Sequence, residues 1–179
     1  MQYISILRGI NVGGKRKILM ADLKKMYERM GFEEVQTYIQ SGNVLFQYAE
    51  NESLGDIEQK LEKQIEKTFG FHVPVIVKSR DEMARIILLN PFSNEQDFKE
   101  EKMYVVFLKQ KPEQLTALDN IPQTEDQFIV KEDFIFLYFA DKISNSVLTN
   151  NLFERKLKTS ATTRNWKTVQ QLIKLTENK

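Results

Sequence analysis

Two periods of apolar residues recur along this chain and predict strands and helices in a fixed order. Short apolar or β-branched runs with a period of two predict strands, and apolar residues at every third or fourth position predict amphipathic helices. The elements predicted in the first half are strands 3–7, 35–39, 44–48 and 73–77 and helices 21–30, 54–69 and 83–89. Their order is βαββαβ followed by a helix.

Residues with strong positional preferences mark the ends of two of these helices. Ser53 carries a hydroxyl that can accept from the amides of the first turn of the second helix, and Gly70 suits the left-handed position that ends it. Ser79 and Glu82 have capping-box spacing before the third helix. These residues support the predicted helix boundaries independently of the apolar period.

The pattern breaks after residue 90 and then begins again. The polar segment 91–101 predicts a connector between a first subdomain, 1–90, and a second subdomain, 102–179. The elements predicted in the second half are strands 103–108, 128–130 and 134–139, helices 112–118 and 147–157, and a last helix that Asn165 caps. Since helices stand where a fourth strand would complete the repeat, the second subdomain is expected to be incomplete, of βαββ type and ending in helices.

The repeated order predicts an α+β fold made of two ferredoxin-like subdomains with antiparallel sheets. In this topology the first two strands run in the same direction, so the loop 9–17 and the turn 41–43 emerge at one end of the sheet. The fourth strand runs oppositely and begins at that end, which brings His72 close to them. The topology therefore predicts a single rim for polar residues that lie far apart in the sequence.

Composition and charge narrow the classes of function. The 179 residues carry 26 basic and 25 acidic side chains, a formal net charge of +1, so no global field draws the chain to nucleic acid or to a membrane. With no cysteine and one histidine, a disulfide framework, a thiol nucleophile and a cysteine or multi-histidine metal site are excluded. The composition leaves open a magnesium or calcium site made of carboxylates alone, and no cofactor is expected. The first apolar run reaches Arg8 too early for a signal peptide, so a soluble cytoplasmic protein with no membrane partner is expected.

Segment 8–17, with the sequence RGINVGGKRK, is the strongest candidate for a binding site. Glycines permit the positive φ angles and the close approach with which backbone amides surround an anion, and four cations add charge. We therefore expect this rim to bind a small phosphate-bearing or other anionic ligand, and the pattern leaves open whether any catalysis occurs. The predicted ligand-binding residues are Arg8 and Lys15 for charge, Gly13 and Gly14 for backbone amides, and Asn11, Ser41 and Asn43 for hydrogen bonds.

Three polar motifs of this chain are similar to the signatures of a known family. They are LRGINVGG at 7–14, TYIQSGNV at 37–44 and TTRNW at 162–166. With them the chain resembles, over nearly its whole length, a bacterial family classed as domain of unknown function 1697. The resemblance implies two ferredoxin-like α/β subdomains and no particular activity, and it adds Arg164 and Asn165 to the predicted ligand-binding residues.

Structural interpretations compete with these assignments. Arg8 and Asn11 can instead hold an ordered loop by bonding to backbone carbonyls. A nucleotide-binding P-loop, with its spacing GxxxxGK at 9–15, is disfavoured because Arg16 stands where a serine or threonine should bind magnesium. Ser41 as a nucleophile would need the one histidine of the chain as its base, whereas a Ser-Gly-Asn turn is explained by local backbone bonding alone.

RNA binding through a sheet surface is a second function to consider. Phe134, Phe136 and Tyr138 alternate onto one face of a strand, as the base-stacking aromatics of RNA-recognition modules do. The strands lack the basic-glycine-aromatic signature of these modules. A structural or homodimerising interaction protein without a ligand is the third alternative, because two packed sheets or a homodimer would bury the same aromatics.

Overall fold

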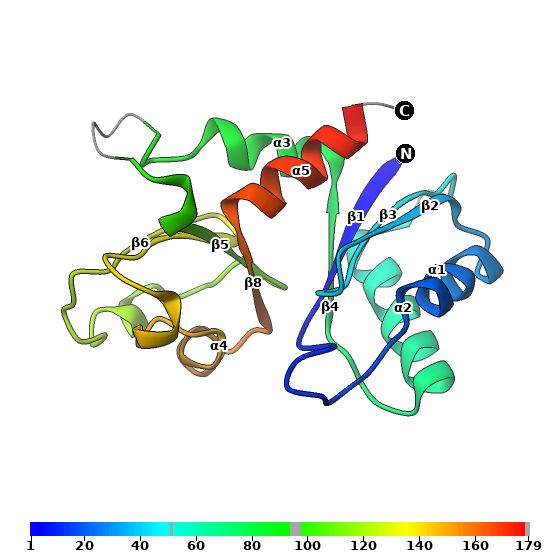
Figure 1. The fold of residues 1–179 in the computed structure, drawn as a ribbon, viewed down its shortest axis with the longest axis horizontal. Helices are drawn as coiled ribbons and strands as arrows, with labels where there is room; N and C mark the ends of the chain where they lie inside the picture. The colour runs from blue at the N-terminus through cyan, green and yellow to red at the C-terminus, as the bar shows by residue number, and fades with distance from the viewer. Residues whose placement is uncertain (51, 94–97, 178–179) are drawn as a thin grey trace. The chain divides into compact units, whose positions relative to one another are not determined.

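The fold is α+β, with two four-stranded antiparallel sheets and the helices that cover them (Figure 1). The computed structural model describes residues 1–50, 52–93 and 98–177. Within these residues no helix has the length and apolar character needed to cross a bilayer. The fold class expected from the order of strands and helices is confirmed.

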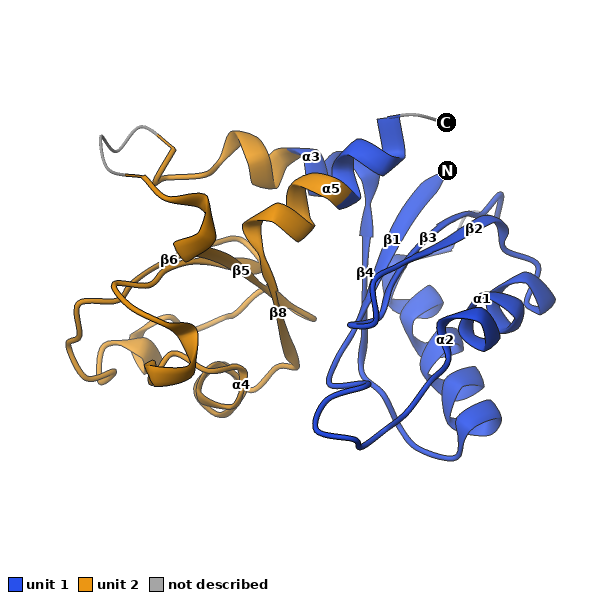
Figure 2. Ribbon diagram, in the orientation of Figure 1, with its two compact units in different colours: residues 1–84, 172–179 blue, residues 85–171 orange. Residues whose placement is uncertain are grey.

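Two compact units make up the chain (Figure 2). The first is Met1–Ala84 together with Leu172–Lys179, and the second is Arg85–Gln171. The chain passes between the units within helix α3 (Arg80–Leu88) and again within helix α5 (Trp166–Glu177). The domain bounds expected from the sequence stay a prediction.

The first unit holds a sheet of order β2-β3-β1-β4 with antiparallel neighbours. Its elements are β1 (Gln2–Leu7), α1 (Met20–Arg29), β2 (Glu33–Tyr38), β3 (Asn43–Gln47), α2 (Leu54–Phe69) and β4 (Val75–Ser79). Helices α1 and α2 lie on one face of the sheet (Figure 1), where Tyr27 of α1 and Leu61 of α2 belong to the same buried apolar cluster as Phe46 of β3. This order with one-sided helices is the ferredoxin-like arrangement.

The second unit repeats this order as β6-β7-β5-β8. Its elements are η1 (Glu100–Lys102), β5 (Met103–Leu108), η2 (Thr116–Leu118), β6 (Gln127–Lys131), β7 (Phe134–Tyr138), η3 (Ile143–Asn145), α4 (Asn150–Leu157) and β8 (Ala161–Asn165). The expectation that this subdomain lacks a fourth strand is wrong, because β8 pairs antiparallel with β5. The sequence of β8, ATTRN, contains no alternation of large apolar residues, so a search for a hydrophobic period of two misses it.

Two helical segments of the second unit are shorter than the sequence predicts. The helix expected over 112–118 is only the 3₁₀ turn η2, because Leu115 and Leu118 supply apolar spacing for a single turn. Helix α4 begins at Asn150 rather than at residue 147. The Thr149 hydroxyl accepts a hydrogen bond from the Leu152 amide at 3.2 Å and so fixes the N-cap there.

The helix ends of the first unit follow the expected caps. The Ser53 hydroxyl accepts a hydrogen bond from the Asp56 amide at 3.2 Å, and Gly70 ends α2 with a φ of +81°. The Glu82 carboxylate accepts from the Ser79 amide at 2.7 Å while the Ser79 hydroxyl accepts from the Glu82 amide at 3.2 Å. Both partners of a capping box are therefore satisfied.

Helix glutamates cover the two edge strands β4 and β8. In each case a glutamate carboxylate accepts hydrogen bonds from backbone amides of the strand beside it. The pairs are Glu62 with Val75 at 2.8 Å, Glu58 with Val77 at 2.9 Å, and Glu154 with Ala161 at 2.9 Å. Amides bonded in this way are not open to pairing with a further strand.

The same two backbone hydrogen bonds occur at the corresponding end of each sheet, where they join the end of the first strand of the unit to the neighbouring loops. The donor and acceptor pairs are Leu7 to Gly42 (2.8 Å) and Arg8 to Pro74 (2.9 Å) in the first unit, and Leu108 to Asp133 (2.9 Å) and Lys109 to Ser160 (2.9 Å) in the second. The internal repeat therefore extends beyond the strands into the loops at this end.

Candidate functional site

The loop 9–17 and the turn 41–43 lie at one end of the first sheet, as the topology predicts. The Leu7 amide donates to the Gly42 carbonyl at 2.8 Å, and the Asn11 side-chain amide donates to the Gln40 carbonyl at 2.9 Å. On the other side of β1, the Arg8 amide donates to the carbonyl of Pro74, just before β4. The geometry thus brings the loop, the turn and the start of β4 together.

Asn11 holds the base of the loop. Its side-chain Nδ2 donates to the Ile18 carbonyl at 3.0 Å and to the Gln40 carbonyl at 2.9 Å, and its Oδ1 accepts from the Ile18 amide at 2.9 Å. Both donor hydrogens of the side-chain amide are therefore used within the protein. Its φ is +56°, a left-handed conformation that asparagine tolerates better than most residues. These contacts give Asn11 a structural role, and its ligand-binding role stays a prediction.

The tip of the loop is a tight turn over residues 12–15. The Lys15 amide donates to the Val12 carbonyl at 3.1 Å, and the two residues form an isolated antiparallel bridge. Gly13 and Gly14 have φ angles of +57° and +74°, as both central residues of a type I′ turn require. Helix α1 begins only at Met20 and the sheet is antiparallel, so the geometry is not that of a P-loop.

Three consecutive cations, Lys15, Arg16 and Lys17, extend from this turn, and all three are exposed. Within the described part of the chain none of them forms an ion pair with a carboxylate. Arg16 has a φ of +48°, and its Nη1 lies 3.8 Å from the position that a Cβ on Gly9 would take. The predicted ligand residues include Lys15 alone of these three, although the KRK run in the sequence marks all of them.

The turn residues Ser41 and Asn43 bond to each other. Asn43 is fully buried, and its Nδ2 donates to the Tyr38 carbonyl at 3.0 Å and to the Ser41 hydroxyl at 3.1 Å. His72 is exposed and forms no hydrogen bond or ion pair with any residue that the structure describes. Among the described residues no hydrogen bond joins Ser41 to His72, so the pair of nucleophile and base is not formed.

Arg164 and Asn165 lie in strand β8 of the second unit. Asn165 Oδ1 accepts from the Thr168 amide at 2.8 Å and so caps α5, as expected. Arg164 is buried, and burial lowers the pKa of its guanidinium to about 10, so it stays charged at neutral pH. Its Nη1 donates at 2.9 Å both to the Thr162 hydroxyl and to the Thr163 carbonyl. A joint role with the loop of the first unit stays a prediction.

The aromatic row on β7 is not an exposed base-stacking surface. Phe134 and Phe136 are 3% and 0% exposed. The Tyr138 ring lies 5.4 Å from the ring of Phe92 and 6.0 Å from that of Phe98, measured between centroids. Aromatics that stack nucleic-acid bases must present open faces, and these do not.

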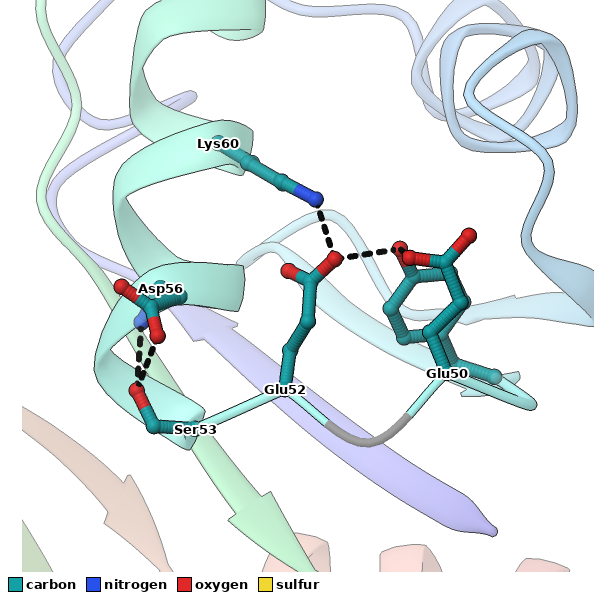
Figure 3. Close-up of polar contacts among 6 residues, drawn as sticks. Glu50, Glu52, Ser53, Asp56 and Lys60 are labelled. Atoms are coloured by element: carbon teal, nitrogen blue, oxygen red, sulfur yellow. Dashed lines mark hydrogen bonds and ion pairs between the residues drawn. The ribbon is translucent and has the colours of Figure 1, made fainter.

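A second polar cluster surrounds the start of helix α2 (Figure 3). The Tyr48 hydroxyl lies 3.0 Å from one carboxylate oxygen of Glu50 and 3.0 Å from one of Glu52, so its single proton is shared between them, and the Lys60 ammonium donates to Glu52. The hydrogen bond from Lys60 lowers the pKa of Glu52, and the same bond raises the pKa of Lys60. No group of three or more metal-ligating side chains occurs among the residues described. The cluster contains an ion pair between Lys60 and Glu52 beside the start of α2.

Comparison with known proteins bears on the fold and the family. No curated protein matches this chain. Among solved structures, the conserved bacterial protein SP0830 from Streptococcus pneumoniae is similar to it, with a TM-score of 0.74 and 23% sequence identity, over 97% of each chain. At this identity the likeness supports the fold alone. Residues 1–136 match the family described as "Protein of unknown function (DUF1697)", as the motifs predict, and the chain belongs to that family.

Proposed function

We propose that this protein binds a small phosphate-bearing or other anionic ligand at its basic turn, which we define as residues 13–17. The observation that carries the proposal is that Lys15, Arg16 and Lys17 are adjacent, exposed and unpaired with carboxylates within the described residues. These three charges are consecutive in the chain, so they lie close together on the loop. Three adjacent cations supply a local positive field on a chain whose net charge is only +1.

The loop is held in shape before any ligand arrives. Asn11 ties its two ends to each other and to the Gln40 carbonyl, and the bridge between Val12 and Lys15 fixes the tip. A preformed site loses less conformational entropy on binding than a flexible one. In this proposal Asn11 orders the loop through these bonds, while Ser41 and Asn43 stay predicted ligand-binding residues.

Arg16 adds a further argument. Its left-handed backbone costs about 1–2 kcal/mol for a residue with a Cβ, and the sequence already contains glycines at neighbouring positions of the loop. Strain of this kind concentrates at functional sites. In the proposed complex the Arg16 guanidinium donates two parallel hydrogen bonds to phosphate oxygens, while Lys15 and Lys17 act as point charges.

Thermal unfolding in the presence of inorganic phosphate, pyrophosphate, nucleotides, sugar phosphates and short RNAs tests this proposal. A ligand at about 100 times its Kd stabilises the folded state by roughly 2.7 kcal/mol, a shift of several degrees in Tm. We expect such a shift for at least one phosphate compound with the wild type. The triple variant Lys15→Ala, Arg16→Ala, Lys17→Ala should show none.

A second triple variant separates the site from general charge. Lys25→Ala, Lys63→Ala, Lys67→Ala removes the same number of charges from exposed positions on α1 and α2. It should keep the ligand-induced shift. If both triple variants lose the ligand-induced Tm shift equally, the shift depends on net charge and not on the basic turn. If no phosphate compound shifts the wild type, the proposal is rejected and the alternative of an interaction protein without a small ligand takes its place.

A further inference from the structure

Strand β6 leaves an edge of the second sheet open. It pairs with β7 over five residues in unbroken register, and no residue outside β7 hydrogen-bonds to its backbone within the described part of the chain. In an antiparallel edge strand, every second residue points its N–H and C=O away from the neighbouring strand. Strands β4 and β8 have such amides bonded by helix glutamates, whereas β6 does not.

A cavity of about 670 Å³ runs beside this edge. Four consecutive β6 residues, 127–130, line it, and consecutive strand residues point to opposite faces, so the cavity follows the edge of the strand. Its lining also includes the apolar side chains of Leu115, Leu118 and Ile121. Leu115 is 47% exposed, so its side chain is open to a partner in this cavity.

The internal repeat explains why this surface is uncovered. In the first unit, the ten-residue helix α1 follows the first strand and lies against the edge strand β2. In the second unit the corresponding connection contains only the three-residue turn η2. The apolar side of β6 is therefore left without the helix that covers its counterpart.

The charges that line the cavity indicate which side chains a bound segment would carry. Asp119 and Asp126 line the cavity, and no lysine, arginine or histidine does. Along the chain, the segment 112–130 contains four carboxylates and no cationic residue. The carboxylate of Asp126 accepts a hydrogen bond from the Ala140 amide at 2.9 Å, which keeps one oxygen in a fixed position at the rim.

We propose that β6 and this cavity bind an extended segment of a partner protein in which apolar and cationic side chains alternate. The segment adds as a strand and bonds to the outward amides and carbonyls of β6. Its apolar side chains enter the cavity beside Leu115, and its long cationic side chains, which start on the opposite face of the added strand, bend around it toward the carboxylates of Asp119 and Asp126. A strand fits better than a helix, because a helix bonds its own backbone and leaves the open groups of β6 without partners.

Fluorescence anisotropy with a labelled seven-residue peptide of alternating valine and lysine tests the proposal. We expect saturable binding to the full chain, and affinity about tenfold or more lower for Leu115→Asp and for Asp119→Lys. Leu88→Asp is the matched control, because Leu88 is 82% exposed and does not line the cavity; its affinity should equal that of the wild type. Circular dichroism verifies that each variant is folded.

Two control peptides and one further measurement identify the occupant. Glutamate in place of lysine should abolish binding, and proline at the central position should weaken it by removing a backbone donor. Hydrogen exchange of alternate β6 amides should slow when the valine-lysine peptide is present. The proposal is overturned if the peptide does not bind, if Leu88→Asp weakens binding as much as Leu115→Asp, or if β6 exchange is unchanged. It is also overturned if the chain forms a dimer that Leu115→Asp disrupts, since a second copy would then be the occupant.

Discussion

Gly42 packs so closely against Leu7 that a Cβ on Gly42 would lie 2.8 Å from the Leu7 Cβ. The same hypothetical atom would lie 2.8 Å from the Ile10 Cδ1, and both Leu7 and Ile10 are buried. The backbone of Gly42 has a φ of +82°, and its carbonyl accepts the Leu7 amide. This contact joins the turn after β2 to the loop after β1. The two segments can approach this closely only because residue 42 is a glycine and has no Cβ.

Gly42→Ala should destabilise the protein by about 2–4 kcal/mol, through left-handed strain and through overpacking against the buried Leu7 and Ile10. Gly31→Ala is the matched control. Gly31 has a φ of +86°, and no atom lies within 4 Å of the position that a Cβ would take, so only strain of about 1–2 kcal/mol is expected there. Urea denaturation measures both free energies of unfolding. If Gly42→Ala and Gly31→Ala lower the free energy of unfolding equally, the close contact of residue 42 with Leu7 and Ile10 adds no destabilisation.

Asn11→Gly should loosen the base of the loop, because glycine keeps the left-handed backbone but loses all three side-chain hydrogen bonds. We expect a loss of about 1–3 kcal/mol in stability. Hydrogen exchange of the Ile18 amide, which donates to Asn11 Oδ1, should become faster than in the wild type. An unchanged Ile18 exchange rate would mean that this bond does not order the loop. Asn120→Gly, in an exposed loop of the second unit, is the control.

Stability should fall at alkaline pH because of Tyr27. Burial raises the pKa of its phenol well above the ordinary value of 10, partly offset by the hydrogen bond with Ser5 at 2.8 Å. Above pH 10 the tyrosine of the unfolded chain loses its proton while folded Tyr27 keeps it. The folded state then binds more protons, so its stability decreases by up to about 1.4 kcal/mol per pH unit for this group.

Tyr27→Phe isolates this contribution. The variant lacks the phenol, so its stability should decline less steeply than that of the wild type between pH 10 and 11. At pH 8 it should be less stable by about 1 kcal/mol, the net value of one hydrogen bond. Urea titrations at pH 8, 10 and 11 give the comparison. Parallel pH profiles for the two proteins would exclude Tyr27 as a source of the alkaline loss.

Ile39→Gly should leave the protein more stable, by about 0.5–1 kcal/mol. Ile39 has a φ of +51°, which is strained for a β-branched residue, and its side chain is 47% exposed. Relief of about 1–2 kcal/mol of strain exceeds the entropic cost of glycine in the unfolded chain. Ile39→Val keeps the branching at Cβ and should bring no gain. A glycine variant less stable than the wild type would indicate that the isoleucine side chain contributes packing.

Local signals in the sequence predicted the helix ends and the order of the first unit. The caps at Ser53 and Gly70 and the capping box of Ser79 and Glu82 act within a few residues, so they can be recognised without knowledge of the fold. The hydrophobic periods predicted the ferredoxin-like order, and that topology placed loop 9–17 beside turn 41–43.

Tertiary structure alone decided the rest. Strand β8 is a strand because β5 pairs with it, although its own residues show no apolar period. Asn11 bonds to the distant Gln40 carbonyl, and Arg164 is buried although four of the five residues of β8 are polar. Helix caps and periods are encoded by neighbouring residues, whereas strand partners, burial and the use of each polar atom depend on contacts between segments that only the folded chain brings together.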